Sequence, residues 1–241
     1  VAVTPNTRAL DHFGQQRENR RRIALGRRRL ADRPLLFPGK VLADAASGKA
    51  RSILVDKDSA WIDIYDDVAG YGPGPSLHWT PDHAKFIWVT ERDGWRHAWL
   101  VDRSGKMDLI TKGNYDVMKV VLTDIVGGWL YYYASPTNGT QMFLWRTRLD
   151  GTGEPQRLTP AGARGMHDYD VSPRGGWAIH TATAWGTPAT TDLVRLPSHQ
   201  VVRTLVTNEA LKATLAGLRQ GKSEFFQVDI GNRVALDGWM M

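Results

Sequence analysis

The sequence contains no cysteine, and this absence excludes disulfide bonds and thiolate metal sites from its 241 residues. It also lacks an apolar run of the roughly 18 residues that a membrane-spanning helix needs. Its start, VAVTPNTRALDHF, has no charged segment followed by the apolar core of a signal peptide. No phosphate-binding loop, dinucleotide-binding glycine motif or H-E-x-x-H zinc motif is present. We therefore expect no cofactor, no metal and no membrane segment, and the cellular compartment stays open.

The net charge of +6 comes from one end of the chain. Residues 1–40 hold ten Lys or Arg against three Asp or Glu, which gives +7, whereas the remainder holds 21 against 22, which gives −1. Clustered arginines bind DNA or RNA by releasing counterions from phosphates. No aromatic residue stands among residues 15–33 for base stacking, however. We expect a solvated helix or an irregular end there, and nucleic acid is the less favoured partner.

Aromatic residues and turn signals gather in residues 77–111. Two apolar runs, FIWVT and HAWLV, flank ERDGWR, whose Asp93-Gly94 pair is typical of a hairpin turn. A second turn at 103–105 leads into MDLIT, so the stretch predicts an antiparallel meander. The ending at Thr111 reappears as DGTGEPQRLT at Thr159 and more loosely as LPSHQVVRTL at Leu205.

This recurrence has an offset near 46 to 48 residues, which fits the roughly 40 to 50 residues of one four-stranded propeller blade. We place three blades at 76–111, 117–159 and 167–205, after an outer hairpin at 41–56 around Ser47-Gly48. The predicted fold is all-β: a partial β-propeller of about three to four four-stranded antiparallel blades.

In the middle blade, Pro136 to Gly139 is expected to form a hairpin turn between strands. Asn138-Gly139 favours the left-handed backbone that a tight turn needs. Asn138-Gly139-Thr140 is also an N-glycosylation triplet, but the turn already accounts for the same residues.

After Val206 the pattern changes. Apolar residues at 211, 215 and 218 predict one short amphipathic helix over 207–219, with Asn208 as its N-cap and Gly221 just past its end. SEFFQVDI and RVALDGWMM then predict a hairpin around Gly231-Asn232. The predicted division is an Arg-rich segment 1–40, blades 41–206 and a C-terminal part 207–241.

Few residues suggest chemistry. The acidic run Asp63 to Asp67 could bind a divalent cation, but a solvated blade edge explains it more simply. His97 and His180 fall within predicted strands, where a hydrogen-bonded structural histidine is the default. Ser76 and Ser223 each match only half of the G-x-S-x-G motif of a nucleophilic serine. We assign no catalytic, cofactor-binding or metal-binding residue.

Several segments together resemble a known family. They are WVTERDGWRHAWL, LITKGNYDVMKVV, GGWLYYYASPTNGTQMFLWRTRLDGTGEPQRLTP, MHDYDVSPRGGWAIHTATAWGTPATTDLV and EFFQVDIGNRVALDGWMM. From about Val41 onward, their order and spacing are similar to the N-terminal propeller of dipeptidyl peptidase IV-type serine peptidases of the prolyl oligopeptidase family. In that family the closing hairpin leads into an α/β-hydrolase domain that carries the Ser, Asp and His triad.

The resemblance implies proteolysis, namely release of N-terminal dipeptides, often Xaa-Pro, by an acyl-enzyme route, with the propeller gating access for short peptide substrates. The hydrolase domain is absent from this chain, and no Glu-Glu pair is present to hold a substrate amino terminus. We transfer no site residue and expect a fragment that is inactive alone. Periplasmic or secreted localisation and a homodimer of the full-length enzyme are further expectations from the family.

Two other classes of function stay open. The chain could be a stand-alone propeller-type module whose blade loops hold a protein partner, because loops at blade ends converge in such folds. Nucleic-acid binding through the Arg-rich start is the second alternative.

Overall fold

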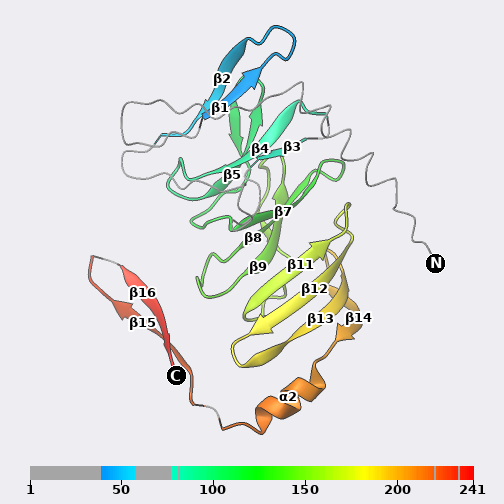
Figure 1. The fold of residues 1–241 in the computed structure, drawn as a ribbon, viewed down its shortest axis with the longest axis vertical. Helices are drawn as coiled ribbons and strands as arrows, with labels where there is room; N and C mark the ends of the chain where they lie inside the picture. The colour runs from blue at the N-terminus through cyan, green and yellow to red at the C-terminus, as the bar shows by residue number, and fades with distance from the viewer. Residues whose placement is uncertain (1–38, 58–76, 81, 220, 233) are drawn as a thin grey trace, which may run out of the picture.

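Aromatic and β-branched runs separated by Gly- and Asp-containing turns fold into antiparallel sheets in the computed structural model (Figure 1). The structure describes residues 39–57, 77–80, 82–219, 221–232 and 234–241. Their elements are β1 (Gly39–Ala43), β2 (Ala50–Val55), β3 (Leu77–Trp79), β4 (Lys85–Thr90), β5 (His97–Asp102), β6 (Met107–Leu109), β7 (Lys119–Asp124), β8 (Trp129–Ala134), β9 (Phe143–Arg148), β10 (Gln156–Arg157), β11 (Met166–Val171), β12 (Trp177–Ala184), β13 (Thr187–Arg195), β14 (Gln200–Val206), α2 (Glu209–Ala216), β15 (Glu224–Asp229) and β16 (Ala235–Met240).

The predicted fold is confirmed. Three four-stranded sheets, β3–β6, β7–β10 and β11–β14, each follow the chain order of a meander. They span residues 77–109, 119–157 and 166–206, within one or two residues of the predicted blades. The hairpin β1–β2 precedes them, and the hairpin β15–β16 lies beyond α2. We call the three complete sheets the first, second and third blade.

The repeat is visible in single hydrogen bonds. The Thr111 hydroxyl accepts from the backbone N–H of Ala98 at 2.9 Å, and in the next blade the Thr159 hydroxyl accepts from Leu144 at 2.9 Å. Both threonines are fully or nearly fully buried, with exposed fractions of 0% and 1%. A backbone donor that the short last strand does not reach is thereby satisfied in both blades. The residue before each threonine, Ile110 or Leu158, is buried as well.

The turns between the last two strands repeat in the same way. The Ser104 hydroxyl donates to Asp102 at 2.5 Å, and the Thr152 hydroxyl donates to Asp150 at 2.7 Å. These bonds favour the carboxylate form and hold the pKa of each aspartate below its usual value. Asp-x-Ser and Asp-x-Thr are therefore the local sequence code for this turn.

A glycine in each of these turns lies against the preceding sheet. Gly105 and Gly151 have φ values of +94° and +70°, a region that favours glycine. A Cβ atom at Gly105 would lie 2.3 Å from the Ile53 carbonyl oxygen, and one at Gly151 would lie 2.4 Å from the Leu109 oxygen. Glycine thus permits both the turn and the close stacking of successive sheets.

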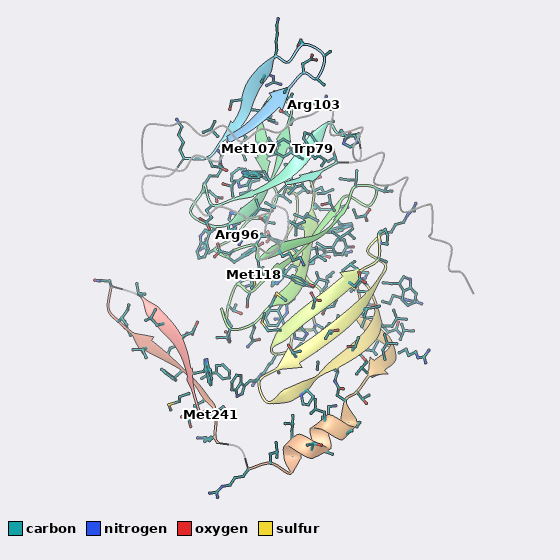
Figure 2. All side chains as sticks on the ribbon, in the orientation of Figure 1. Trp79, Arg96, Arg103, Met107, Met118 and Met241 are labelled. Atoms are coloured by element: carbon teal, nitrogen blue, oxygen red, sulfur yellow. The ribbon has the colours of Figure 1, made fainter. Side chains whose placement is uncertain are left out.

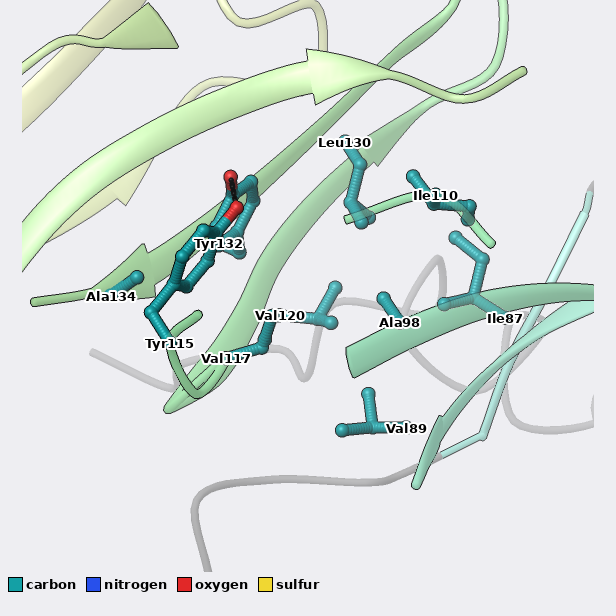
Figure 3. Close-up of a cluster of buried hydrophobic side chains, with 10 residues drawn as sticks. All are labelled: Ile87, Val89, Ala98, Ile110, Tyr115, Val117, Val120, Leu130, Tyr132 and Ala134. Atoms are coloured by element: carbon teal, nitrogen blue, oxygen red, sulfur yellow. Dashed lines mark hydrogen bonds between the residues drawn. The ribbon is translucent and has the colours of Figure 1, made fainter. Parts of the chain in front are cut away.

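The apolar core lies between the blades. Figure 3 shows the cluster between the first and second blades, which is closed by a 2.8 Å hydrogen bond between the Tyr115 and Tyr132 hydroxyls. A second cluster joins the second blade to the third, and a third joins β2 to the first blade. Since each sheet buries its faces against its neighbours, stacking holds the fold together.

The predicted backbone of the turn at Asn138-Gly139 is wrong, because neither residue is among those with positive φ. The turn is instead held by the Asn138 side chain, which accepts from the Thr140 amide at 2.9 Å and the Thr140 hydroxyl at 2.7 Å. The connection between Ala134 and Phe143 is too long for a two-residue turn, so the left-handed geometry is not needed.

The helix is shorter than predicted. It ends at Ala216, with Gly217 as its C-cap in place of Gly221. Asn208 stands at the N-cap, but its side chain makes no capping hydrogen bond and donates to the Ala189 carbonyl at 2.6 Å. The Asn208 side chain therefore ties the helix to the start of β13 and leaves the helix terminus without a side-chain cap.

Candidate functional site

The contact between the second and third blades holds a group of titratable side chains, which we call the histidine–tyrosine cluster. Its members are Tyr133, His167, Tyr169, His180 and His199. Perturbed titratable groups gather at functional sites more often than elsewhere, so this cluster is the first candidate.

Strand alternation places the cluster. His167 and Tyr169 stand two residues apart in β11 and so point to one face of the sheet. His180 in β12 is the direct ladder partner of Tyr169. His199 follows the third strand of the same blade, in the β13–β14 turn. Three histidines of one blade thus meet around one tyrosine.

The histidine rings contact each other directly. His167 Nδ1 and His180 Nε2 are 2.9 Å apart, and their ring centroids are 5.2 Å apart at an angle of 15°. The Tyr169 ring stacks on His180 at 4.4 Å, and its hydroxyl lies 2.8 Å from His199 Nε2. Both bonded histidines are buried, with 3% and 5% of their surface exposed.

The tyrosines connect this group to the second blade. The Tyr133 hydroxyl of β8 accepts from the Tyr169 amide at 2.5 Å and donates to Asp168 at 2.9 Å. The Tyr169 hydroxyl lies 2.9 Å from the hydroxyl of Thr159. Burial raises the pKa of both tyrosines above the ordinary value, so their hydroxyls stay protonated.

Burial also controls the histidines. The pKa of His180 is lowered to about 4, by burial first and then by the neighbouring His199 and His167, against the opposing charges of Asp192 and Asp168. The pKa of His199 is lowered by burial too. Since a buried imidazolium without a counter-ion is costly, His180 is neutral at ordinary pH.

The pKa of His167 is lowered for the same main reason. Burial is its largest cause, the charges of Arg157 and His199 add to it, and the backbone of Arg164 opposes it. In the described part of the chain, His167 Nε2 and His180 Nδ1 form no hydrogen bond of normal geometry. Within the described residues, both outer nitrogens are thus buried without a hydrogen bond, and the Arg164 backbone is the one group that favours a charge on His167.

The cluster does not have the arrangement of a catalytic centre. Its tyrosine hydroxyls are satisfied by Asp168, Thr159 and His199, and its tyrosines are held protonated by burial. Within residues 39–57, 77–80, 82–219, 221–232 and 234–241, no three His, Asp or Glu side chains are placed to hold a metal ion. What these side chains do is connect two blades.

A second buried polar group joins β2 to the first blade. The Trp88 indole N–H donates to Asp56 Oδ2 at 2.7 Å, and the Arg92 guanidinium lies 3.0 Å from Asp56 Oδ1. Asp56 is only 4% exposed, so both partners are needed to compensate its charge. This group is again structural.

The histidines chosen from sequence lie where predicted. His97 begins β5 and His180 lies inside β12, and both are hydrogen-bonded. His97 Nδ1 is 2.8 Å from Asp93 Oδ2, and Nε2 is 3.0 Å from the Gly113 carbonyl oxygen. Sequence reasoning missed His167 and His199. The alternation in MHDYDV could have placed His167 beside Tyr169 on the buried face.

The other candidates are scattered. Ser223 lies between α2 and β15, away from a strand-to-helix turn. Asn138 lies in the exposed β8–β9 turn, where its side chain is bonded to Thr140. Asp63 to Asp67 and Ser76 lie outside the described residues.

A groove separates that turn from the C-terminal hairpin. Its volume is about 560 Å³, and it is lined by Ser135 to Thr140, Phe225 to Gln227, Asp237 and Gly238. Two ring side chains of β15 thus face a polar turn of the second blade.

Among the described helices, none is long and apolar enough to cross a membrane.

Comparisons with known proteins agree on one family. Residues 40–189 match the family described as the dipeptidyl peptidase IV (DPP IV) N-terminal region. A protein of Emericella nidulans named "Probable dipeptidyl peptidase 4" is 23% identical over 193 residues, which cover 79% of this chain and 25% of that protein. The crystal structure of Porphyromonas gingivalis dipeptidyl peptidase 4 superimposes with a TM-score of 0.69 at 25% identity, covering 83% of this chain and 27% of that one. The chain therefore spans about a quarter of the length of these relatives.

Proposed function

This chain belongs to the dipeptidyl peptidase IV N-terminal region family, and from that premise we propose that it is the non-catalytic propeller portion of a serine peptidase of the dipeptidyl peptidase IV type. The reaction of the whole enzyme is release of N-terminal dipeptides, often Xaa-Pro, from peptide substrates. The triad belongs to an α/β-hydrolase domain outside these 241 residues. The blades gate the access of peptides to that domain.

The observation that carries this proposal is the state of the β15–β16 hairpin. Phe225, Leu236 and Trp239 are 57%, 52% and 55% exposed. An isolated two-stranded hairpin is marginal in water, and large exposed apolar patches mark interaction surfaces. Figure 2 shows Met241 at the end of this hairpin, whose ring contacts with the described blades are those of Phe225 and Trp239 with Trp185.

The exposed hairpin supports a division of the chain into three parts. Residues 41–206 form the blades, residues 207–241 connect them to the hydrolase domain, and the Arg-rich residues 1–40 precede them. The apolar faces of the β15–β16 hairpin are covered by the hydrolase domain in the full-length enzyme. Burial of such side chains contributes about 1.5–3 kcal/mol each, which is enough to fix the orientation of the two domains.

The test compares two proteins. The 241-residue chain and the full product of its reading frame are assayed with a chromogenic Xaa-Pro dipeptide substrate. We expect only the longer protein to turn over the substrate. We also expect this activity to be lost when the serine of its G-x-S-x-G motif is replaced by alanine. A reading frame that stops without a hydrolase domain contradicts the proposal.

A stand-alone interaction module is the second candidate, because the same exposed hairpin could hold a protein partner. The reading frame separates the two. Nucleic-acid binding rests on residues 15–33, which lie outside the described residues. It predicts salt-dependent retention on immobilised DNA that is lost when residues 1–33 are removed. Homodimerisation of the full-length enzyme stays a prediction.

A further inference from the structure

We propose that the contact between the second and third blades is an acid-sensitive seam, which opens when the His167–His180 pair takes up protons. The seam is defined here by the histidine–tyrosine cluster and by the two backbone bonds that join Met142, just before β9, to Gly165 and His167. Its role is independent of the peptidase proposal, since it concerns only the described blades.

The hydrogen bond between the two histidines requires that only one of the two facing nitrogens carries a proton. In the 2.9 Å contact between His167 Nδ1 and His180 Nε2, one nitrogen donates and the other accepts. If both imidazoles are charged, both nitrogens carry protons and the contact becomes repulsive. The outer nitrogens, His167 Nε2 and His180 Nδ1, are buried and have no hydrogen-bond partner among the described residues. Added protons therefore destabilise this arrangement.

The pair sits directly on the blade contact. The backbone N–H of His167 donates to the Met142 carbonyl oxygen of the second blade at 3.2 Å. The Met142 N–H donates back to the Gly165 oxygen at 3.1 Å. A shift of the His167 ring is therefore coupled to two bonds that cross the seam.

Groups on several elements face the pair, and they do not neutralise it. Arg157 of β10 and His199 of the β13–β14 turn disfavour a charge on His167. Asp168 of β11 and Asp192 of β13 favour a charge on His180, but burial outweighs them. The Arg164 backbone favours a charge on His167, and burial outweighs it as well. Uncharged rings also face the pair, namely Phe143 at 5.7 Å from His167 and Tyr169 at 4.4 Å from His180.

The direction of the pH effect follows from these shifts. An unfolded histidine has a pKa of about 6.5, whereas both folded histidines titrate lower, His180 at about 4. Folding is therefore favoured fully above about pH 6.5, and the advantage is lost as the pH falls toward about 4. The seam is closed at neutral pH and opens in mild acid.

The other blade contact supplies a matched control. Between the first and second blades, the Val117 N–H donates to the Arg96 carbonyl oxygen at 2.7 Å. The histidine nearest to it, His97, has an acceptor for each nitrogen, namely Asp93 and the Gly113 carbonyl. Both ring nitrogens of His97 are thus hydrogen-bonded, unlike the outer nitrogens of the His167–His180 pair, and this contact is the control.

Amide hydrogen exchange of the 241-residue chain, corrected for intrinsic rates, measures both contacts at once. Between about pH 6.5 and 5 the protection of the His167 and Met142 amides is expected to fall by up to about tenfold per pH unit for each histidine that gains a proton on opening. The protection of Val117 is expected to stay constant. Equal loss at all three amides, or no loss at any, would overturn the proposal.

A variant tests whether the pH dependence comes from the histidine pair or from carboxylates. His180→Phe keeps a ring against Tyr169 but removes one of the two proton sites, so the pH dependence at Met142 is expected to fall to that of His167 alone. His83→Asn removes an exposed histidine with a positive φ and is the control that keeps the wild-type dependence. If His180→Phe does not fold, imidazole NMR of the wild-type chain decides. Titration of both His167 and His180 below the ordinary value supports the proposal, and an ordinary titration of either refutes it.

Discussion

The second blade and the C-terminal segment, residues 200–241, are built from similar residues but differ in burial. Leu130 and Tyr132 of β8 are fully buried, whereas Trp239 of β16 is 55% exposed. Every residue of β14 is exposed, and of the described helix residues Glu209–Ala216 none is buried. The difference is the presence of a neighbouring sheet on each side of the second blade. Strand-forming residues fix the local structure, and a stacked neighbour supplies the stability.

The largest expected effect tests whether that neighbour matters. Tyr132→Ala removes a fully buried ring and leaves the Tyr115 hydroxyl without its 2.8 Å partner. We expect the free energy of unfolding to fall by about 3–5 kcal/mol, as measured by denaturant titration. Trp239→Ala, on the exposed hairpin, is expected to change it by less than about 1 kcal/mol. Equal costs at the two sites would remove the contrast between the regions.

Turn glycines sharpen the comparison, because they report how closely two sheets approach. Gly151→Ala places a methyl group 2.4 Å from the Leu109 carbonyl oxygen of the preceding blade. Gly153 has nearly the same φ, +71° against +70°, but nothing lies within 4 Å of an added Cβ. We expect about 1–2 kcal/mol for Gly153→Ala from backbone strain alone, and about 1–3 kcal/mol more for Gly151→Ala. Thermal unfolding of both variants gives the difference, and identical melting temperatures would argue against close stacking.

The repeated threonines give the smallest expected effect. Thr111→Val and Thr159→Val each leave a buried backbone N–H without its 2.9 Å acceptor. The expected cost is about 1–3 kcal/mol in each blade. Thr204→Val in the exposed strand β14 is the control, with an expected change within about 0.5 kcal/mol. Because the Thr159 hydroxyl also lies 2.9 Å from the Tyr169 hydroxyl, its loss is expected to cost at least as much as the loss of Thr111. A cost near that of the control at either position would contradict the role of the repeated bond.

The sequence predicted the fold well because its signals are local and repeated. Turn dipeptides such as Asp93-Gly94 and the recurring endings at Thr111 and Thr159 gave the blade limits to within one or two residues. The detailed turn geometry was harder. Asn138 acts through its side chain, and Asn208 bonds to Ala189 in another strand, which no local pattern shows.

The candidate site was predicted only in part. His180 was recognised as a structural histidine inside a strand, but its partner His167 was not. Their contact depends on the register that places Tyr169 opposite His180, and register is set by pairing across the sheet. A single sequence shows which residues alternate, and it does not show which strand faces them.

Residue-by-residue hydrogen exchange at neutral pH tests the central claim most directly, namely that stacking between blades stabilises this chain and that the C-terminal segment lacks such a neighbour. The account predicts that the slowest amides lie in β4, β5, β8 and β9, and that those of β14, β15 and β16 exchange much faster. Amides of β15 and β16 that exchange as slowly as those of β8 would contradict it.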